Sequence, residues 1–244
     1  MQLGRLIGSG NVAEVFEAGA DVLKLYRPGI GREQAEREIA ICSVVARLPL
    51  PVPQVRGLHE VEGRWGVLMS RAPGRPLIDS ELWHDAVAMA TGLARLHRLV
   101  HAQLGAPLAK YKARLARNLR AAPLLGEADR VRLLDRLEAL PDGDRLCHGD
   151  FHPANIMGSL EAPTIIDWLD ASQGPAEADA CRTYLLALHH MPDLAEPYLA
   201  AYVGLAGFSR SQVTDWLPVI AGARLAENIG AEAEKLVALS RSGP

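Results

Sequence analysis

The residues best suited to chemistry in this 244-residue chain form one short polar segment. It runs from 148 to 155, reads His-Gly-Asp-Phe-His-Pro-Ala-Asn and has apolar residues on both sides. Polar side chains held between apolar segments must either satisfy buried hydrogen bonds or face a ligand. Asp150, Asn155 and, further along the chain, Asp167 offer hard oxygen ligands of the kind that magnesium prefers. Magnesium completes its octahedron with water and phosphate oxygens, so these residues indicate chemistry on a phosphate compound.

A second candidate region lies near the N-terminus. Residues 8–13, Gly-Ser-Gly-Asn-Val-Ala, form a turn of small residues between two strand-like runs. Glycine lets backbone N–H groups approach phosphates closely, although such a turn also fits an ordinary β-hairpin. Lys24 lies within the apolar run 22–26, an unusual place for a cation unless its ammonium meets an anion. The following helix offers Glu36 or Glu38 as the acidic partner.

The elements that position these residues differ between the two ends of the chain. The first part is dominated by short β-like runs punctuated by glycine. Apolar residues at helical spacing predict a helix over 32–48. This helix ends at the proline-rich segment 49–53, because the proline ring is incompatible with a continuing helix. The predicted strands are residues 3–7, 13–18, 22–26, 55–60 and 64–70.

The later part is dominated by segments rich in Ala, Leu and Arg with helical patterns. A long helix is predicted from about 79 to 98, with Asp79 or Ser80 as its N-cap. A polar loop at 146–156 and a short strand at 164–167 carry the candidate site residues. The other predicted helices cover 108–121, 127–140 and the chain from about 176 onward.

This change in composition predicts an α+β fold with two lobes. The first, residues 1–70, is a small antiparallel β-sheet lobe with one helix. Residues 71–76 form a hinge. Residues 77–244 form a larger, mostly helical lobe with the polar loop and the substrate site.

Composition excludes several classes of protein. Apolar residues make up 49% and charged residues 23%, which is typical of a globular protein. A formal net charge of −3 without a long basic run argues against nucleic acid as a partner. No apolar run approaches the roughly 20 residues that a membrane helix needs, so the protein is expected to be cytoplasmic. The sequence gives no indication of an oligomeric state.

The glycine-rich turn, Lys24, segment 148–155 and Asp167, in this order along the chain, resemble the motifs of the aminoglycoside phosphotransferase and choline kinase family. The fold of that family is related to that of protein kinases. Segment 148–155 matches the family's H-G-D-x-H-x-x-N catalytic loop, and residues 166–168 match its I-D-W metal motif. The first motif is highly specific, and the second follows it at a short distance. The resemblance covers nearly the whole chain and implies a two-lobed, protein-kinase-like fold.

The resemblance also implies a role for each matching residue. Asp150 would be the catalytic base, and Asn155 and Asp167 would hold Mg²⁺. Lys24 would hold the phosphates of ATP, and Glu38, rather than Glu36, would orient that lysine. Further nucleotide contacts are implied for the phosphate-covering turn and for the hinge region, namely Gly8, Ser9, Gly10, Val15, Met69, Ser70 and Arg71. Asp179 resembles a buried aspartate that braces the catalytic loop.

The function implied is a small-molecule kinase that moves the γ-phosphate of ATP to a hydroxyl of an aminoglycoside, a choline-like alcohol or another metabolite. A protein kinase is an alternative, but no A-P-E segment follows Asp167, and Ala13 replaces the third glycine of the protein-kinase loop. A non-catalytic nucleotide-binding module is another alternative. A metal hydrolase using His148, Asp150 and His152 would leave Lys24 and the I-D-W motif unexplained.

The acceptor is the least determined part of this prediction. Five acidic residues in the later part of the chain would suit an acidic pocket for a cationic amine, or would simply form a solvated face. They are Asp170, Glu177, Glu227, Glu232 and Glu234.

Overall fold

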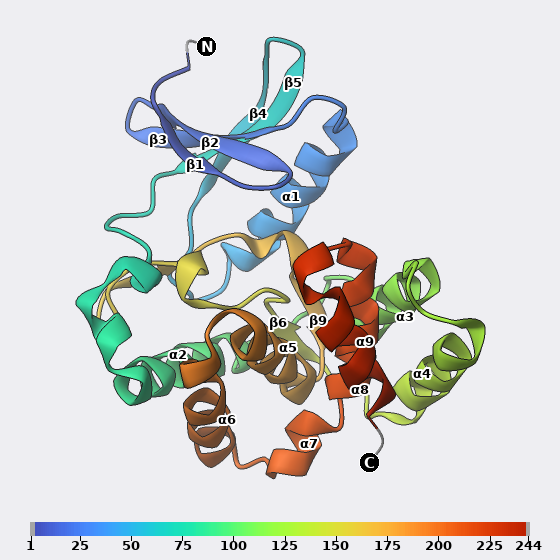
Figure 1. Ribbon diagram of the computed structural model, residues 1–244. Coiled ribbons are helices and arrows are strands. Elements are labelled where there is room, and N and C mark those ends of the chain that lie inside the picture. The colour runs from blue at the N-terminus through green and yellow to red at the C-terminus, as the bar shows by residue number, and fades with distance from the viewer. Residues whose placement is uncertain (1–2, 243–244) are drawn as a thin grey trace. The chain divides into compact units, whose positions relative to one another are not determined.

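The computed structural model describes residues 3–242, which divide into two compact units (Figure 1). The first unit contains residues up to 77 together with 154–169, and the second contains 78–153 and 170 onward. Residues 154–169 thus belong with the N-terminal part, whereas the sequence analysis assigned them to the second lobe. The lobe boundaries and the hinge stay predictions. No helix in the described part of the chain is long and apolar enough to cross a membrane.

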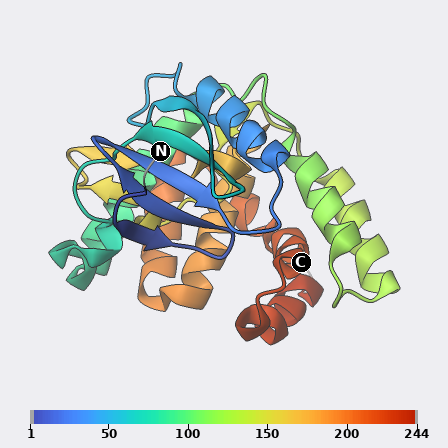
Figure 2. The same cartoon turned by 90° about the horizontal axis from the view of Figure 1, so that it is seen from above.

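The first unit is built on a five-stranded antiparallel sheet with strand order β1-β2-β3-β5-β4. Its strands are β1 (Leu6–Ser9), β2 (Ala13–Ala18), β3 (Asp21–Tyr26), β4 (Val55–Val61) and β5 (Arg64–Ser70). Helix α1 (Arg32–Val45) packs against β4 and β5, and Figure 2 shows it running alongside the sheet. The short hairpin of β7 (Ile156–Gly158) and β8 (Pro163–Ile165) completes the unit.

Alternation along β3 decides which side chains face α1. Leu23 and Leu25 are fully buried in one apolar cluster, whereas Tyr26 belongs to a second cluster that also contains Ala35 of α1. Because successive side chains of a strand point to opposite faces, Lys24 shares the face of Tyr26. The strand period therefore directs this lysine toward α1.

The second unit is mostly helical, as predicted. Helix α2 (Ala86–His101) packs along α6, and α8 packs against α3 and α9. The short strands β6 (Arg145–Cys147) and β9 (Ser172–Gly174) pair antiparallel, and in sequence they lie on either side of segment 148–155. The remaining helices are α3 (Tyr111–Ala121), α4 (Glu127–Ala139), α5 (Ala176–His190), α6 (Pro192–Ala206), α7 (Arg210–Thr214), α8 (Leu217–Arg224) and α9 (Ala233–Arg241).

Several predicted helix boundaries differ from those of the structure, most clearly at the start of α2 and the end of α1. The segment expected to open the long helix forms two 3₁₀ turns, Leu77–Asp79 and Glu81–His84, and neither Asp79 nor Ser80 caps α2. The cap is Asp85, whose carboxylate accepts a hydrogen bond from the backbone N–H of Ala88 at 2.9 Å. Helix α1 ends at Val45 rather than at 48, because residues 46–50 already form turns ahead of the prolines.

Candidate functional site

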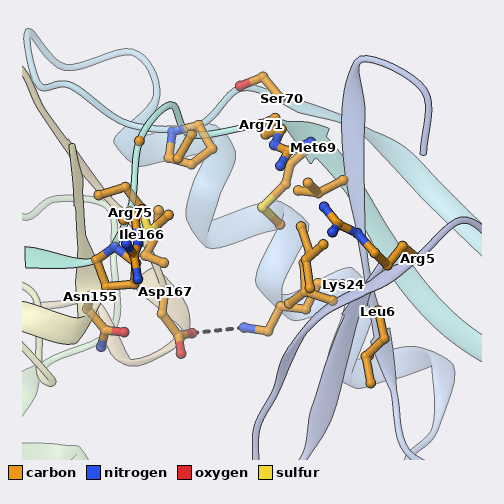
Figure 3. A pocket seen from close by; sticks show the side chains of 18 of the residues that line it. Arg5, Leu6, Lys24, Met69, Ser70, Arg71, Arg75, Asn155, Ile166 and Asp167 are labelled. Carbon is orange, nitrogen blue, oxygen red and sulfur yellow. Dashed lines mark hydrogen bonds and ion pairs between the residues drawn. The ribbon is translucent and has the colours of Figure 1, made fainter. Parts of the chain in front are cut away.

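The first unit contains a cavity of about 540 Å³ next to β3, α1 and the β7–β8 hairpin. Its polar lining includes Lys24, Asn155 and Asp167, which Figure 3 labels, and Glu38. Further polar side chains line it as well, namely Arg5, Ser70, Arg71 and Arg75. Its apolar wall includes Val15, Val22, Met69, Met157 and Ile166. A cavity that combines apolar side chains with several polar and charged groups is typical of a site for a planar ring that carries a charged group.

Lys24 is the electrostatic centre of this cavity. Its Nζ lies 2.7 Å from Oε1 of Glu38 and 2.8 Å from Oδ1 of Asp167, and its side chain is 13% exposed. Burial alone would lower the pKa of Lys24, but the two carboxylates outweigh it and raise that pKa above its usual range. The lysine is therefore charged and aimed into the cavity.

Glu38 is the acidic partner, and Glu36 is not. Glu38 is buried in α1 and accepts a second hydrogen bond from the hydroxyl of Tyr26. Glu36 instead pairs with Arg32 on the exposed side of the helix, at 2.8 Å. Burial and the neighbouring Glu38 raise the pKa of Tyr26 above its usual range, so the tyrosine remains a hydrogen-bond donor. The only feature of the sequence that points to Tyr26 as a partner is its position two residues after Lys24.

Asp167 and Asn155 meet through the backbone. The N–H of Ile166 donates to the carbonyl of Asn155 at 2.9 Å, and Figure 3 shows both side chains on the same side of the cavity. Asp167 has φ = 62°, in the left-handed region that non-glycine residues seldom adopt. Such a conformation at an active-site residue is a recognised form of stored strain. Here it turns the carboxylate toward Lys24 directly after strand β8.

The predicted nucleotide-binding residues are only partly gathered at this cavity. Val15, Met69, Ser70 and Arg71 line it, as do Lys24, Glu38, Asn155 and Asp167. Gly8, Ser9 and Gly10 do not line it; Gly8 is half-buried, and the other two are exposed. Their turn is held by Arg27, which donates to Oγ of Ser9 at 2.9 Å and to the carbonyl of Gly10. The sequence analysis missed Arg27, which follows β3 directly.

The segment 148–152 lies in the second unit, where Asp150 contacts two basic groups. Oδ2 of Asp150 lies 3.3 Å from Nε2 of His152, and Oδ1 lies 3.6 Å from Nη2 of Arg182. Burial would raise the pKa of Asp150, but the hydrogen bond from His152 and the charge of Arg182 outweigh it and hold that pKa well below its usual range. Asp150 is therefore ionised at neutral pH.

Gly149 is required by the shape of this loop. Its φ is +85°, and a Cβ at this position would lie 2.7 Å from Nη2 of Arg114 and 2.7 Å from the carbonyl oxygen of Asp170. Any larger residue would combine backbone strain with a clash. The backbone N–H of Asp150 donates to Nδ1 of His148, which is fully buried. His148 thus shapes the loop rather than facing solvent.

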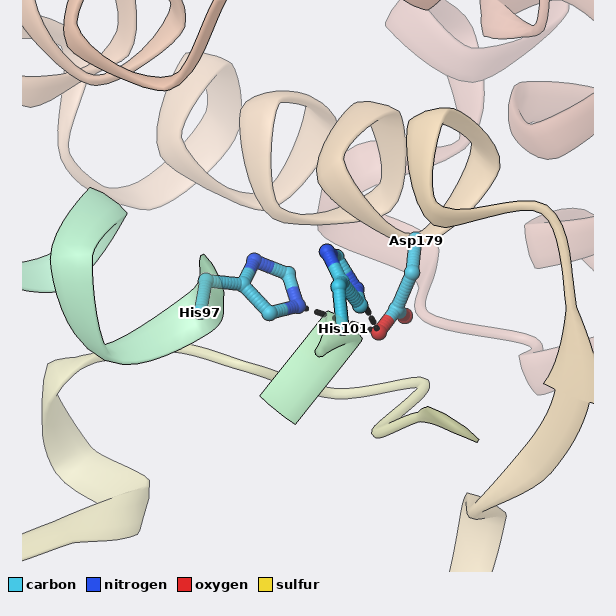
Figure 4. Close-up of side chains that lie close together, drawn as sticks. All are labelled: His97, His101 and Asp179. Carbon is cyan, nitrogen blue, oxygen red and sulfur yellow. Dashed lines mark hydrogen bonds and ion pairs between the residues drawn. The ribbon is translucent and has the colours of Figure 1, made fainter. Parts of the chain in front are cut away.

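Asp179 of α5 braces the loop from behind. Its Oδ2 accepts the backbone N–H of His148 at 2.6 Å, and its Oδ1 accepts that of Gly149 at 2.8 Å. The same Oδ2 contacts Nε2 of His97 at 3.0 Å and Nε2 of His101 at 3.1 Å, both from α2 (Figure 4). The loop is thereby tied to two helices.

The two histidines and Asp179 have the spacing of a metal site, but their atoms are already engaged. Nδ1 of His97 lies 2.7 Å from the hydroxyl of Tyr198, and Nδ1 of His101 lies 2.6 Å from that of Tyr202. With each Nε2 engaged by Asp179 and each Nδ1 by a tyrosine hydroxyl, all four ring nitrogens have a hydrogen-bond partner. The cluster is a hydrogen-bonded brace.

Arg182 is the second residue that sequence reasoning missed. It lies on α5, its side chain is 7% exposed, and it joins Asp150 to Glu227. Its position three residues after Asp179 was the only available signal, because residues three apart lie on the same face of a helix. The predicted brace and the arginine therefore approach the loop from one helix.

Three solved structures share the fold of the chain. An aminoglycoside-3'-phosphotransferase of type VIII is 22% identical, with 91% of this chain and 90% of that chain covered and a TM-score of 0.64. A thermostable mutant of aminoglycoside phosphotransferase APH(4)-Ia in a ternary complex with ADP and hygromycin B is 16% identical, with coverage of 98% and 93% and a TM-score of 0.72. The ternary complex of streptomycin, ATP and APH(2'')-IIa is 15% identical, with coverage of 98% and 90% and a TM-score of 0.61. The fold is that of the kinase-like phosphotransferases.

The sequence itself gives the family. Residues 4–216 match the model of the phosphotransferase enzyme family, APH, and the chain belongs to this family. The resemblance drawn from the two motifs is confirmed. No curated protein sequence matches the chain.

Proposed function

We propose that this phosphotransferase uses ATP and Mg²⁺ to phosphorylate a hydroxyl group of a small molecule. One observation carries the proposal: a buried, charged lysine stands between Glu38 and Asp167 in a cavity that is also lined by apolar side chains such as Met69 and Ile166. Two of the solved structures named above contain ADP or ATP, which favours the same class of nucleotide here. Residues 1–70 would then form the nucleotide-binding lobe and 71–76 the hinge.

The residues of the cavity fit magnesium and a triphosphate. Asn155 and Asp167 supply hard oxygen ligands from adjacent backbone segments, as an octahedral cation with phosphate ligands requires. Bound there, the cation would neutralise charge on the transferred phosphoryl group. Lys24 would add a further positive charge, held in place by Glu38. Met69, Ser70 and Arg71 would contact the adenine, and Gly8, Ser9 and Gly10 would cover the phosphates.

Asp150 is proposed to act on the acceptor. Its carboxylate is ionised, and Arg182 and His152 hold it in one orientation. A carboxylate of low basicity suffices, because phosphoryl transfer proceeds through a loose transition state in which the protein mainly positions the reactants. Asp150 would orient the acceptor hydroxyl and take its proton as the new bond to phosphorus forms.

The proposal is tested by incubating the purified protein with ATP labelled at the γ-phosphate and pooled hydroxylated metabolites, with and without Mg²⁺. The expected result is magnesium-dependent transfer of label to at least one metabolite. Saturable ATP binding without transfer in any pool would instead identify a non-catalytic nucleotide-binding module. Transfer to protein substrates but not to metabolites would favour a protein kinase.

A further inference from the structure

The acidic residues that suggested a pocket for a cationic amine are mostly neutralised by arginines. Glu227 is held between Arg182, at 2.8 Å, and Arg224, also at 2.8 Å. Arg224 also binds both carboxylate oxygens of Glu232. Glu232 in turn accepts a hydrogen bond from Nε2 of His190 at 2.7 Å. These ion pairs form a continuous chain that begins at Asp150.

The arginines of this chain are buried. The side chains of Arg182 and Arg224 are 7% and 5% exposed, and that of Glu232 is 3% exposed. Salt screens buried ion pairs far less than exposed ones, so these pairs persist at physiological ionic strength. Within each pair, the positive charge of the arginine offsets the negative charge of the carboxylate. Neither Glu227 nor Glu232 therefore presents an uncompensated charge to a ligand.

Asp170 is compensated in a similar way on another side of the loop. Nη1 of Arg114 lies 3.0 Å from Oδ2 of Asp170, and the guanidinium also lies over the ring of Tyr111. Arg114 approaches Gly149 so closely that a Cβ there would touch it. Three guanidinium groups thus face the four carboxylates of Asp150, Asp170, Glu227 and Glu232.

The two remaining acids do not change this balance. Glu177 lines a different cavity of the second unit, together with Arg98 and Arg145. Glu234 is exposed at the start of α9. Because the four carboxylates around the loop face three guanidinium groups, only one net negative charge remains there.

From this charge balance we infer that the acceptor is a neutral or anionic hydroxyl compound, such as a sugar, a polyol or a hydroxy acid, and not a polycationic amino sugar. The inference rests on the proposed phosphotransfer, whose acceptor it specifies. Recognition of a polycation requires a surplus of carboxylates. Around this loop the carboxylates are already paired with arginines, whose positive charges would repel a polycation. Arg114 is the specificity determinant most open to test, because its partner Asp170 is 42% exposed and would stay hydrated if freed.

The first experiment titrates streptomycin and hygromycin B into the protein saturated with a non-hydrolysable ATP analogue, using calorimetry. The expected result is no saturable binding by the unaltered protein at micromolar concentrations. Arg114→Met frees the carboxylate of Asp170 and is expected to strengthen binding of either compound by about tenfold or more. Arg117→Met is the control, since Arg117 is exposed on the same helix and should change nothing. Micromolar binding of an aminoglycoside by the unaltered protein overturns the inference.

The second experiment compares turnover of matched acceptors that differ in charge, such as glucosamine, glucose and glucuronate. If the protein phosphorylates these compounds, kcat/KM for glucosamine is expected to be at least about tenfold below kcat/KM for glucose. Preference for the amino compound overturns the inference. If no acceptor is phosphorylated, the result counts against the proposed phosphotransfer. The calorimetric titration requires no turnover, so it tests the charge preference of the acceptor site independently.

Discussion

Oε1 of Glu38 lies 2.7 Å from Nζ of Lys24, and the glutamate is almost completely buried. The pair joins helix α1 to strand β3 within the first unit. A buried ion pair of this kind is costly to break, because the remaining charge is left without a partner in a poorly solvated place. Lys24 is consequently held in one position, and this position sets the first prediction.

Glu38→Gln is expected to lower kcat/KM for ATP by about 10- to 100-fold, because a misplaced phosphate ligand costs rates of this order. The amide retains a hydrogen bond to Lys24 but loses the charge attraction. Glu36→Gln is the matched control, since it removes only an exposed pair with Arg32. Steady-state kinetics at varied ATP concentration measure both variants, and equal values for the two would contradict the role of Glu38.

Asp150→Asn is expected to lower kcat by about 10² to 10⁴, the usual contribution of a general base. Binding of an ATP analogue should be nearly unchanged, because this side chain is not proposed to contact the nucleotide. Calorimetry and single-turnover assays separate the two quantities. Asp144→Asn, at a position with a 62% exposed side chain, is the control. Loss of analogue binding in Asp150→Asn would contradict the assignment.

Asp167→Asn is expected to raise the magnesium concentration required for half-maximal nucleotide binding by about tenfold or more, since the change removes a charged oxygen ligand. The variant also removes one of the two carboxylates that contact Lys24. Glu161→Gln, at an exposed position between β7 and β8, is the control. An unchanged magnesium titration for Asp167→Asn would exclude this residue as a metal ligand.

The brace behind the loop predicts a dependence of stability on pH. Burial is the main cause that lowers the pKa of His97 from 6.5 to about 3, and the nearby His101 adds to it, although Asp179 opposes both. Below pH 6.5 the unfolded chain gains a proton at this histidine while the folded protein does not. The free energy of unfolding should therefore decrease as the pH falls from about 6.5 toward 3.

Urea unfolding at about pH 4.5 and pH 7 measures this effect, since both values lie above the range in which Asp179 loses its charge. His97→Gln retains a donor and an acceptor but does not titrate, so its unfolding free energy should change less between the two pH values. His84→Gln, at an exposed position of the same unit, serves as the control. An unaltered pH dependence in His97→Gln would show that other groups cause it.

The strands of the first unit were largely predictable because their signals are local. Residues 13–18 and 64–70 were predicted with the bounds that the structure has, since alternating apolar residues between glycine turns fix a strand without reference to distant parts of the chain. The boundary at α2 was not predictable in this way. Asp79, Ser80 and Asp85 are all good capping residues, and the tertiary position of the preceding turns selects among them.

The sequence by itself determined the chemistry available to this protein. Segment 148–155 and the motif at 166–168 identify the family, and the apolar run around Lys24 identifies a cation that needs an anion. These are properties of residue type and spacing, which the chain carries whether or not it is folded.

Only the tertiary structure decided which charges meet. Glu38 rather than Glu36 pairs with Lys24 because the face of α1 that packs on the sheet carries Glu38. Arg182 meets Asp150 and Glu227 because segments remote in sequence pack together and expel water between them. Such pairings depend on distances between distant segments, so composition and periodicity do not reveal them.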